Sequence, residues 1–434
     1  MAHFAIISPD AAGHLLAIGS VGKELVGRGH RVTVVALAEA EPITQRLELP
    51  LFKLDNDDVP ASADYLLRPA FAICGGRWIL GHRRWFESYA HVMLRKVPAA
   101  LRELAADGVL IDQNLLAGGT AAERSGLPYV TICSALPFHE EIGMPPLFTA
   151  WGYAQGWRAR WRNRLGYAGW HWFMRPAMKV IHRQRRAWRL PPLARVDDVF
   201  SPLAQISQLC AEFDFPRREL PPQFHYIGSF ANRRVNAGQQ FPWHRLDDRP
   251  LIFASLGTIP DPSNLPVFRA ILAACAELDA QLVLALGQWR DKQDSVQEQL
   301  GPVPANALVV DFAPQMELLD RAALLITHAG VNTVLEALSC GVPMVALPRN
   351  TDQTGMAARV AYTGAGLRAS FRRCEPLELR ALVQRVLAED IFRRRARELQ
   401  RAMLAAGGSQ RAAEIAEEAL TTRRPVKRPG TDGR

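Results

Sequence analysis

"HFAIISPDAAGHLLAIGSVGKELVGRGHRVTVVAL" (residues 3–37) decides the fold of the first half of the chain. Its first six residues form an apolar strand, and the "PDAAGH" that follows contains turn-forming residues and is predicted to be a loop. From Leu15 to Gly27 apolar residues recur at helical spacing, Gly29 ends the helix, and Arg31 begins a second apolar strand. Strand, loop, helix and strand in this order are typical of a doubly wound α/β domain with a parallel sheet.

The same pattern restarts at Pro250, where an apolar strand is followed by a helix-like stretch. Apolar runs predict further strands at 108–112, 128–133, 251–258, 280–287, 307–312, 323–328 and 344–348. A chain of 434 residues is too long for one compact core. The sequence therefore predicts two Rossmann-like domains whose doubly wound parallel sheets face a common cleft, where ligands bind in such sheets.

The domain boundaries follow from composition. Residues 231–249 are polar and rich in turn-forming residues, which is typical of a linker. They divide the chain into a first domain, 1–230, and a second domain, 250–422. The last residues, 423–434, are basic and contain proline, so we expect a disordered tail.

The net charge of +9 is a local feature. Between Glu141 and Asp197 there are eleven Lys and Arg residues and no acidic residue. The rest of the chain lacks a nucleic-acid motif, so we expect no nucleic-acid partner. There is no signal peptide, and the six cysteines lack the spacing of metal ligands, so we expect a cytoplasmic protein.

A nicotinamide-dependent oxidoreductase is an alternative for two such domains. The G-x-G-x-x-A pattern that would support it occurs at Gly364, Gly366 and Ala369. It follows none of the predicted strands and precedes no obvious ribose-binding acid, so the sequence argues against a dinucleotide site.

The stretch from Phe312 to Gln353, "FAPQMELLDRAALLITHAGVNTVLEALSCGVPMVALPRNTDQ", has the features of an anion site. A buried strand ends at His328, Gly330 lies in the turn that follows, and a helix begins at Asn332. A helix that begins directly after a strand directs free N–H groups and the positive end of its dipole into the cleft. Thr333 and the His328 and Asn332 side chains add hydrogen-bond donors.

This stretch resembles the donor-binding signature of the family-1 glycosyltransferases, the UDP-glycosyltransferases of the two-domain GT-B fold. The residues that carry the resemblance are Pro314-Gln315, Thr327-His328-x-Gly330-x-Asn332-Thr333, Glu336, Gly341-Val342-Pro343, Pro348 and Asp352-Gln353. The resemblance implies that the second domain binds a UDP-sugar and that the first binds the acceptor.

The resemblance also implies a role for each donor-site residue. Contacts to the diphosphate are implied for His328, Asn332 and Thr333, with Thr258 capping a phosphate. Glu336 would accept hydrogen bonds from the ribose, and Asp352 and Gln353 would bind the sugar hydroxyls. The backbone of Ala313 would pair with the uracil edge, and Phe312 would stack on uracil where plant members usually have a tryptophan.

His14 and Asp112 are the predicted catalytic pair. His14 lies in the loop that follows the first strand, and Asp112 ends the strand at 108–112, so both lie at the cleft end of the sheet. A histidine there can take a proton from an acceptor hydroxyl, and the carboxylate would fix its tautomer. Both positions also match the family pattern. We expect an inverting displacement without metal or cofactor, in which the UDP-sugar is a co-substrate.

The acceptor is predicted from a narrower resemblance to the bacterial zeaxanthin (carotenoid) glucosyltransferases. The stretches that carry it are "GVLIDQ" (108–113), "SALP" (134–137), "SPLAQISQL" (201–209), "EFDFPR" (212–217) and "IFASLGT" (252–258). It implies glucose transfer from UDP-glucose to a lipophilic carotenoid. Alternatives are another lipophilic acceptor (a macrolide, sterol or flavonoid), a sugar-nucleotide epimerase or hydrolase of the same fold, and a non-catalytic partner protein.

The resemblance fails mainly between Pro145 and Val199, where acceptor contacts arise in this fold. Six of the ten tryptophans lie between Trp151 and Trp188, interleaved with arginines. Such a pattern suits a helix at an anionic membrane surface, which makes the segment 151–195 a candidate peripheral membrane contact on the inner face of the membrane. The alternatives are an aromatic core helix with a solvated basic edge and an RNA-binding surface.

Overall fold

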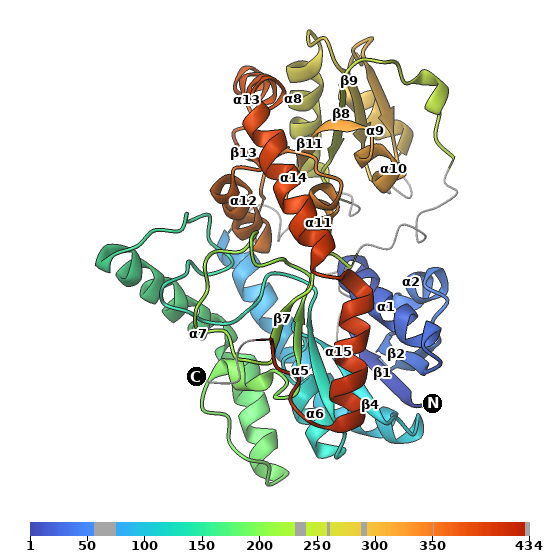
Figure 1. Cartoon of the computed structure of the whole chain (residues 1–434), viewed down its shortest axis with the longest axis vertical. Coiled ribbons are helices and arrows are strands. Elements are labelled where there is room, and N and C mark those ends of the chain that lie inside the picture. The colour runs from blue at the N-terminus through green and yellow to red at the C-terminus, as the bar shows by residue number, and fades with distance from the viewer. Residues whose placement is uncertain (56–74, 231–239, 258–260, 288–292, 350, 430–434) are drawn as a thin grey trace.

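A computed structural model describes residues 1–55, 75–230, 240–257, 261–287, 293–349 and 351–429. Two parallel β-sheets form the centres of two domains that follow one another along the long axis of the molecule (Figure 1). The prediction of two doubly wound α/β domains is confirmed. None of the helices in these residues is long and apolar enough to cross a membrane.

The sheet of the first domain has its earliest strand near the middle. In spatial order its strands are β3 (Leu51–Leu54), β2 (Arg31–Leu37), β1 (His3–Ile7), β4 (Gly108–Asp112), β5 (Tyr129–Cys133), β6 (Gln205–Ser207) and β7 (Phe224–Tyr226). Its helices are α1 (Ala12–Gly27), α2 (Glu41–Arg46), α5 (Gly75–Glu103), α6 (Gly118–Arg124) and α7 (Trp157–Ala187), with 3-10 turns η1 (Ala38–Ala40) and η2 (Val196–Val199). The order reverses beside β1, which places the switch point of the sheet at the loop before α1.

The second domain repeats this topology. Its strands, in spatial order, are β10 (Ala307–Val310), β9 (Gln281–Ala285), β8 (Leu251–Ser255), β11 (Ala322–Thr327), β12 (Met344–Ala346) and β13 (Gly366–Arg368). The helices are α8 (Leu265–Cys275), α9 (Gln293–Leu300), α10 (Gln315–Leu319), α11 (Val331–Ser339), α12 (Thr351–Thr363), α13 (Pro376–Ala388) and α14 (Asp390–Ala405), with 3-10 turns η4 (Trp243–Arg245) and η5 (Pro262–Asn264). The switch point here lies between β8 and β11.

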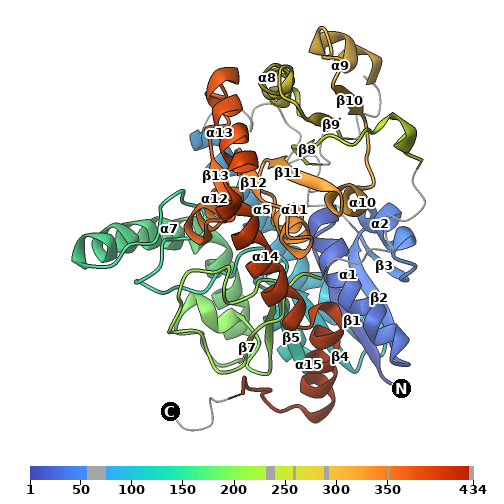
Figure 2. The ribbon, with the colours of Figure 1, turned by 45° about the horizontal axis from the view of Figure 1, so that its top comes forward.

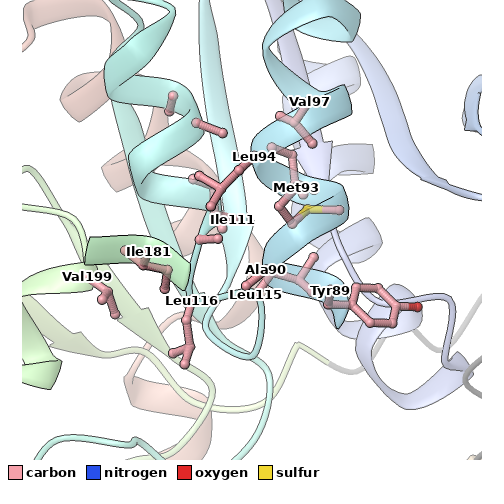
Figure 3. Close-up of a cluster of buried hydrophobic side chains, with 14 of the residues drawn as sticks. Tyr89, Ala90, Met93, Leu94, Val97, Ile111, Leu115, Leu116, Ile181 and Val199 are labelled. Atoms are coloured by element: carbon pink, nitrogen blue, oxygen red, sulfur yellow. The ribbon is translucent and has the colours of Figure 1, made fainter. Parts of the chain in front are cut away.

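Helix α5 is held against the first sheet by a buried apolar cluster (Figure 3). Met93, Leu94 and Val97 of α5 pack in this cluster with Ile111 of β4 and Ile181 of α7. All five side chains are at most 4% exposed. Because burying each such side chain is worth about 1.5–3 kcal/mol, this packing fixes α5 and α7 relative to the strand that ends at Asp112.

The chain returns to the first domain at its end. Helix α15 (Gly408–Thr422) lies beside the first sheet in both ribbon views (Figures 1 and 2). Its Glu417 accepts hydrogen bonds from Arg28 Nε at 2.6 Å and pairs with His30 Nε2 at 3.0 Å. Residues 423–429, predicted to be disordered, also lie on this domain: Val426 is buried, its N–H donates to Leu203, and its carbonyl lies 2.9 Å from His225 Nε2.

Candidate functional site

The side chains around His14 lie at the ends of three neighbouring strands of the first sheet. Strands β1, β4 and β5 are parallel and adjacent, so their carboxyl ends lie side by side. Asp112 is the last residue of β4, and Ser134 follows β5 directly. His14 lies in the first turn of α1, which begins at Ala12, so the observed loop is shorter than the predicted "PDAAGH". The histidine is nevertheless at the cleft end of the sheet, as expected.

The His14 ring is held through one nitrogen. Its Nδ1 lies 2.9 Å from Asp112 Oδ2 and 2.7 Å from Ser134 Oγ. Ser134 donates its only proton to Asp112 Oδ2, so its oxygen can only accept from His14. Asn114 donates through its backbone N–H and its side chain to Asp112 Oδ1, both at 2.9 Å. The network therefore places the proton on Nδ1 and leaves Nε2 as the nitrogen that can accept one.

The charges around this pair set its protonation. Burial alone would lower the pKa of His14, but the Asp112 carboxylate, with smaller contributions from Asp352 and Asp10, outweighs burial and holds the pKa above its ordinary value of 6.5. Burial alone would raise the pKa of Asp112, but His14, Ser134 and Asn114 hold it below its ordinary value. Asp112 thus stays ionised and stabilises the imidazolium that forms when His14 takes a proton.

A second buried carboxylate precedes His14 by four residues and was not expected from the sequence. Asp10, in the loop before α1, is 7% exposed and accepts a hydrogen bond from Tyr89 at 2.6 Å. Tyr89 lies on α5 at the edge of the buried cluster, with its hydroxyl directed away from the other labelled side chains (Figure 3). Asp10 adds to the electrostatic effects that raise the pKa of His14.

Asn332 joins the two domains at the site. It lies in the first turn of α11, and its Nδ2 donates to the carbonyl of Gly13 at 2.8 Å. Its Oδ1 accepts from Gln208 Nε2 at 3.0 Å, and Gln208 also donates to the carbonyl of Ser134. A residue of the predicted diphosphate site is therefore bonded to the backbone directly before His14.

The His328 ring lies beside two glycines, Gly257 and Gly330. It follows β11, and a Cβ atom at Gly330 would lie 2.6 Å from its Nε2, while one at Gly257 would lie 3.1 Å away. A larger residue at Gly330 would displace the ring. Burial lowers the pKa of His328 to about 4, so the imidazole is neutral near pH 7. Thr258, the predicted phosphate cap, lies outside the described residues.

The predicted ribose and base contacts gather next to α11. Gln315, the first residue of α10, donates through Nε2 to the Glu336 carboxylate of α11. Burial raises the pKa of Glu336 to about 7. Phe312 and Thr333 are half-buried and Ala313 is buried, all within the segment from β10 to α11. The structure thus brings Gln315 and Glu336 together, although they are 21 residues apart.

Asp352 and Gln353 lie in the first turn of α12, which follows β12. Thr351 donates to Asp352 Oδ1 at 3.0 Å, and Gln353 Oε1 accepts from the backbone N–H of Arg349 at 3.1 Å. Burial raises the pKa of Asp352, while the neighbouring His14 opposes that rise. Asp352 and His14 also line the same cavity, so the predicted sugar contact and the predicted base lie near one another across the domain boundary.

A cavity of about 580 Å³ begins at this boundary. His14, Asn114, Thr351 and Asp352 form its polar end. Much of the rest of its wall is aromatic and includes Trp85, Phe86, Phe138, Phe148, Trp170 and Phe173. A large apolar cavity with a few polar groups at one end is typical of a site for an apolar small molecule. It would hold a lipophilic compound with one polar group near His14.

Comparisons with known proteins show which family the chain is similar to. Residues 269–420 match the family described as "Erythromycin biosynthesis protein CIII-like, C-terminal domain". The chain is 35% identical over 427 residues to the zeaxanthin glucosyltransferase of Pantoea ananas, with 98% of each chain covered. It is 34% identical over 433 residues to that of Pseudescherichia vulneris, with 97% of this chain and 98% of that one covered.

The fold is also that of known glycosyltransferases. The crystal structure of the kitacinnamycin glycosyltransferase superposes with a TM-score of 0.75 at 23% identity and covers 96% of this chain and 99% of its own. Similarity to the zeaxanthin glucosyltransferases extends over nearly the whole chain, so the relationship includes both domains. The chain therefore belongs to the family-1 glycosyltransferases of the GT-B fold, in the group that includes the bacterial zeaxanthin glucosyltransferases.

Proposed function

We propose that this glycosyltransferase moves glucose from UDP-glucose to a hydroxyl of a carotenoid such as zeaxanthin. The observation that carries the proposal is the aromatic cavity, whose polar end contains both His14 and Asp352. A lipophilic alcohol in that cavity would place its hydroxyl between the base and the sugar. The names of the two zeaxanthin glucosyltransferases support the same acceptor and sugar. Such an enzyme would meet its acceptor as a peripheral protein at a membrane.

The proposed reaction is a single displacement with inversion. His14 Nε2 takes the proton of the acceptor hydroxyl while that oxygen attacks the anomeric carbon of glucose. The bond from this carbon to the diphosphate oxygen breaks on the opposite face, and UDP leaves. Asp112 stabilises the imidazolium, which later releases its proton to solvent. The Nδ1-protonated tautomer fixed by Asp112 and Ser134 is the one that this step requires.

The leaving diphosphate would be stabilised at the start of α11. The free N–H groups of this helix, the positive end of its dipole and the Thr333 side chain act on it together with His328. An arriving diphosphate favours the cationic imidazole, so the pKa of His328 would rise from about 4 on binding. Asn332 would turn from Gly13 to a phosphate oxygen or bridge the two. These groups would supply the positive charge that a metal ion supplies to the leaving diphosphate in other enzymes.

The rest of the donor would lie along the second domain. Glu336, supported by Gln315, would accept hydrogen bonds from the ribose hydroxyls. Uracil would stack on Phe312 and pair with the backbone of Ala313, and Thr258 would cap a phosphate. Asp352 and Gln353 would bind hydroxyls of the glucose, which then lies beside His14. In this arrangement the anomeric carbon would lie at the polar end of the cavity.

The proposal is tested by mass spectrometry of reaction products. The enzyme is incubated with zeaxanthin, a macrolide, a sterol or a flavonoid, each with UDP-glucose, UDP-galactose or dTDP-glucose. We expect one or two hexoses to be added to zeaxanthin from UDP-glucose, with the β configuration by NMR. If another acceptor class is glycosylated and zeaxanthin gives no product, the proposal of a carotenoid acceptor is rejected. A product with the α configuration would reject inversion.

A further inference from the structure

Helix α7 carries large apolar side chains on its outer face. Trp157, Trp161, Leu165 and Trp172 are 68%, 57%, 71% and 49% exposed. Their spacing of four, four and seven residues places them on one side of the helix. The opposite side, which includes Trp170, is buried. The core-helix alternative therefore fits Trp170 but not the exposed residues, and such a group of exposed apolar side chains marks an interaction surface.

Cations surround this apolar face. Arg158, Arg160 and Arg164 are exposed between and beside the tryptophans. The guanidinium carbon of Arg158 lies 5.3 Å from the ring centre of Trp157, and that of Arg164 lies 5.5 Å from that of Trp161. The chain has no acidic residue between Glu141 and Asp197, so none on helix α7 itself opposes them. We call Trp157, Trp161, Leu165 and Trp172 with these three arginines the α7 face.

The chemistry of the α7 face fits an anionic phospholipid bilayer. Tryptophan rings prefer the headgroup layer, arginine reaches the phosphates, and an aliphatic side chain as exposed as Leu165 is stabilised by acyl chains. Helix α7 extends beyond the rest of its domain in both ribbon views, so a flat surface can reach it (Figures 1 and 2). Single-stranded RNA would use the rings and arginines but would leave Leu165 in water.

The cavity opens at the same helix. Trp172 belongs to the α7 face and also lines the cavity, and Arg83 of α5 lies 3.7 Å above its ring. Gly169 lines the cavity too, is exposed, and a side chain added there would meet no atom within 4 Å. The cavity therefore reaches the solvent-exposed surface at Gly169 of α7, next to Trp172.

We propose that the α7 face docks on the anionic headgroups of a bilayer and that the cavity receives its acceptor from that bilayer through the opening beside Gly169. The docking stands on the exposure and charge of α7 alone. The delivery step rests on the proposed lipophilic acceptor. An acceptor that enters this way reaches His14 along aromatic side chains without passing through water.

Docking is tested by flotation of the full-length protein with vesicles of phosphatidylglycerol and phosphatidylcholine. We expect the wild type to float at low salt and to be released as salt is raised, because screening weakens the arginine contacts. Each arginine at such a surface contributes about a fivefold change in partition, so R158E/R160E/R164E should weaken binding by at least about a hundredfold. W157S/W161S/L165S should also weaken it, with less dependence on salt.

Control variants change exposed arginines and exposed leucines in the second domain. R372E/R394E/R401E reverses three exposed arginines there, and L377S/L404S replaces two exposed leucines. Both variants should float like the wild type. Equal losses in the control and α7 variants would overturn the assignment of the surface. A wild type that stays in solution at low salt, or that binds single-stranded RNA in preference to vesicles, would overturn the docking itself.

Delivery is tested by transfer assays with the acceptor either in vesicles or dispersed in detergent. R158E/R160E/R164E should lose turnover on the vesicle-held acceptor and keep it in detergent, because these arginines lie outside the cavity. Gly169→Trp should float like the wild type but lose transfer in both assays, since the new ring fills the opening. If the docking variants lose flotation yet keep vesicle turnover, delivery from the bilayer is wrong. If no carotenoid is glycosylated, flotation still decides the docking.

Discussion

Arg359 of α12 and Asp214, which lies between β6 and β7, form an ion pair that joins the two domains, with Nε and Oδ1 2.7 Å apart. Their side chains are 1% and 0% exposed. Asp214 also accepts hydrogen bonds from Arg217 and Tyr226. Burial alone would raise the pKa of Asp214, but the two arginines lower it to about 2. The pair ties α12, whose first turn holds Asp352, to the domain that carries His14.

Asp214→Asn should destabilise the protein strongly. The substitution removes the negative charge and leaves Arg217 and Arg359 buried without compensation, which costs about 3–5 kcal/mol of the free energy of unfolding. Urea denaturation measures this change. The control is Glu277→Gln, which breaks a pair with Arg380 in which the carboxylate is 76% exposed, and should change stability by less than about 1 kcal/mol. Similar losses in both variants would contradict the role of the buried pair.

His14→Ala should reduce turnover by about 10²–10⁴-fold while UDP binds nearly as in the wild type. The reason is that the variant loses the base and leaves the donor site of the second domain intact. Asp112→Asn should also reduce turnover without weakening UDP, because the imidazolium loses its counter-charge. Initial rates and calorimetry with UDP measure the two effects, with exposed His244→Ala as the control. Full turnover of His14→Ala would reject the catalytic assignment.

The rate should depend on pH through His14. The base must be neutral in the free enzyme, and its pKa lies above the ordinary 6.5, so kcat/KM should fall as pH drops through that raised value. Asp112 is the largest cause that raises this pKa. In Asp112→Asn the acid limb of the residual activity should therefore move to lower pH. An acid limb at the same pH in both proteins would show that another group controls it.

EDTA should leave turnover unchanged if helix α11 and His328 stabilise the leaving diphosphate without a metal ion. The measurement compares initial rates after exhaustive EDTA treatment with rates after Mg²⁺ or Mn²⁺ is added back. A loss of activity that added metal restores would reject metal-independent transfer. His328→Ala gives the complementary result: turnover should fall by about 10²–10³-fold, as on removal of one preorganised donor to a developing charge.

The long apolar strands could be predicted from the sequence because buried parallel strands are nearly continuous hydrophobic runs. Strands β3, β6, β7 and β13 were not predicted: none exceeds four residues, and β6 reads Gln-Ile-Ser. Such strands are specified by their neighbours in the sheet. Helix α15 was assigned with the second domain by chain order, whereas contacts across 387–389 residues place it on the first.

The residues of the site also divide into those that the sequence predicts and those whose contacts depend on the fold. Asp112 could be predicted because it ends an apolar strand, and His14 because it follows one. Ser134 carries no local signal for its role: its bond to His14 joins residues 120 apart and depends on β5 lying beside β4. Asn332 was predicted as a diphosphate ligand, but its bond to Gly13 depends on how the domains meet. Sequence patterns thus located the strand ends, and the sheet order decided which side chains touch.

Glu336→Ala should weaken UDP and UDP-glucose alike, because the ribose is common to both. Loss of a charged hydrogen-bond acceptor is worth about 1.5–3 kcal/mol, or roughly tenfold to a hundredfold in Kd. Because the carboxylate is the better acceptor and its pKa is about 7, UDP should also bind more weakly as pH falls below 7 in the wild type. Glu336→Gln should remove that dependence. Calorimetry over a range of pH values measures both effects.

Asp352→Ala should separate the sugar from the nucleotide. Its carboxylate lines the cavity beside His14, and the bonded pair Gln315 and Glu336 is not among the residues that line this cavity. UDP-glucose should therefore bind about tenfold more weakly while UDP is unchanged. The same calorimetric titrations with the two ligands give the answer, and Thr363→Ala, further along α12, is the control within the same helix. Because α12 is held to the first domain by Arg359 and Asp214, the loss should come from the missing hydrogen bonds rather than from movement of the helix. Equal losses for UDP and UDP-glucose would place Asp352 at the nucleotide and reject its contact with glucose.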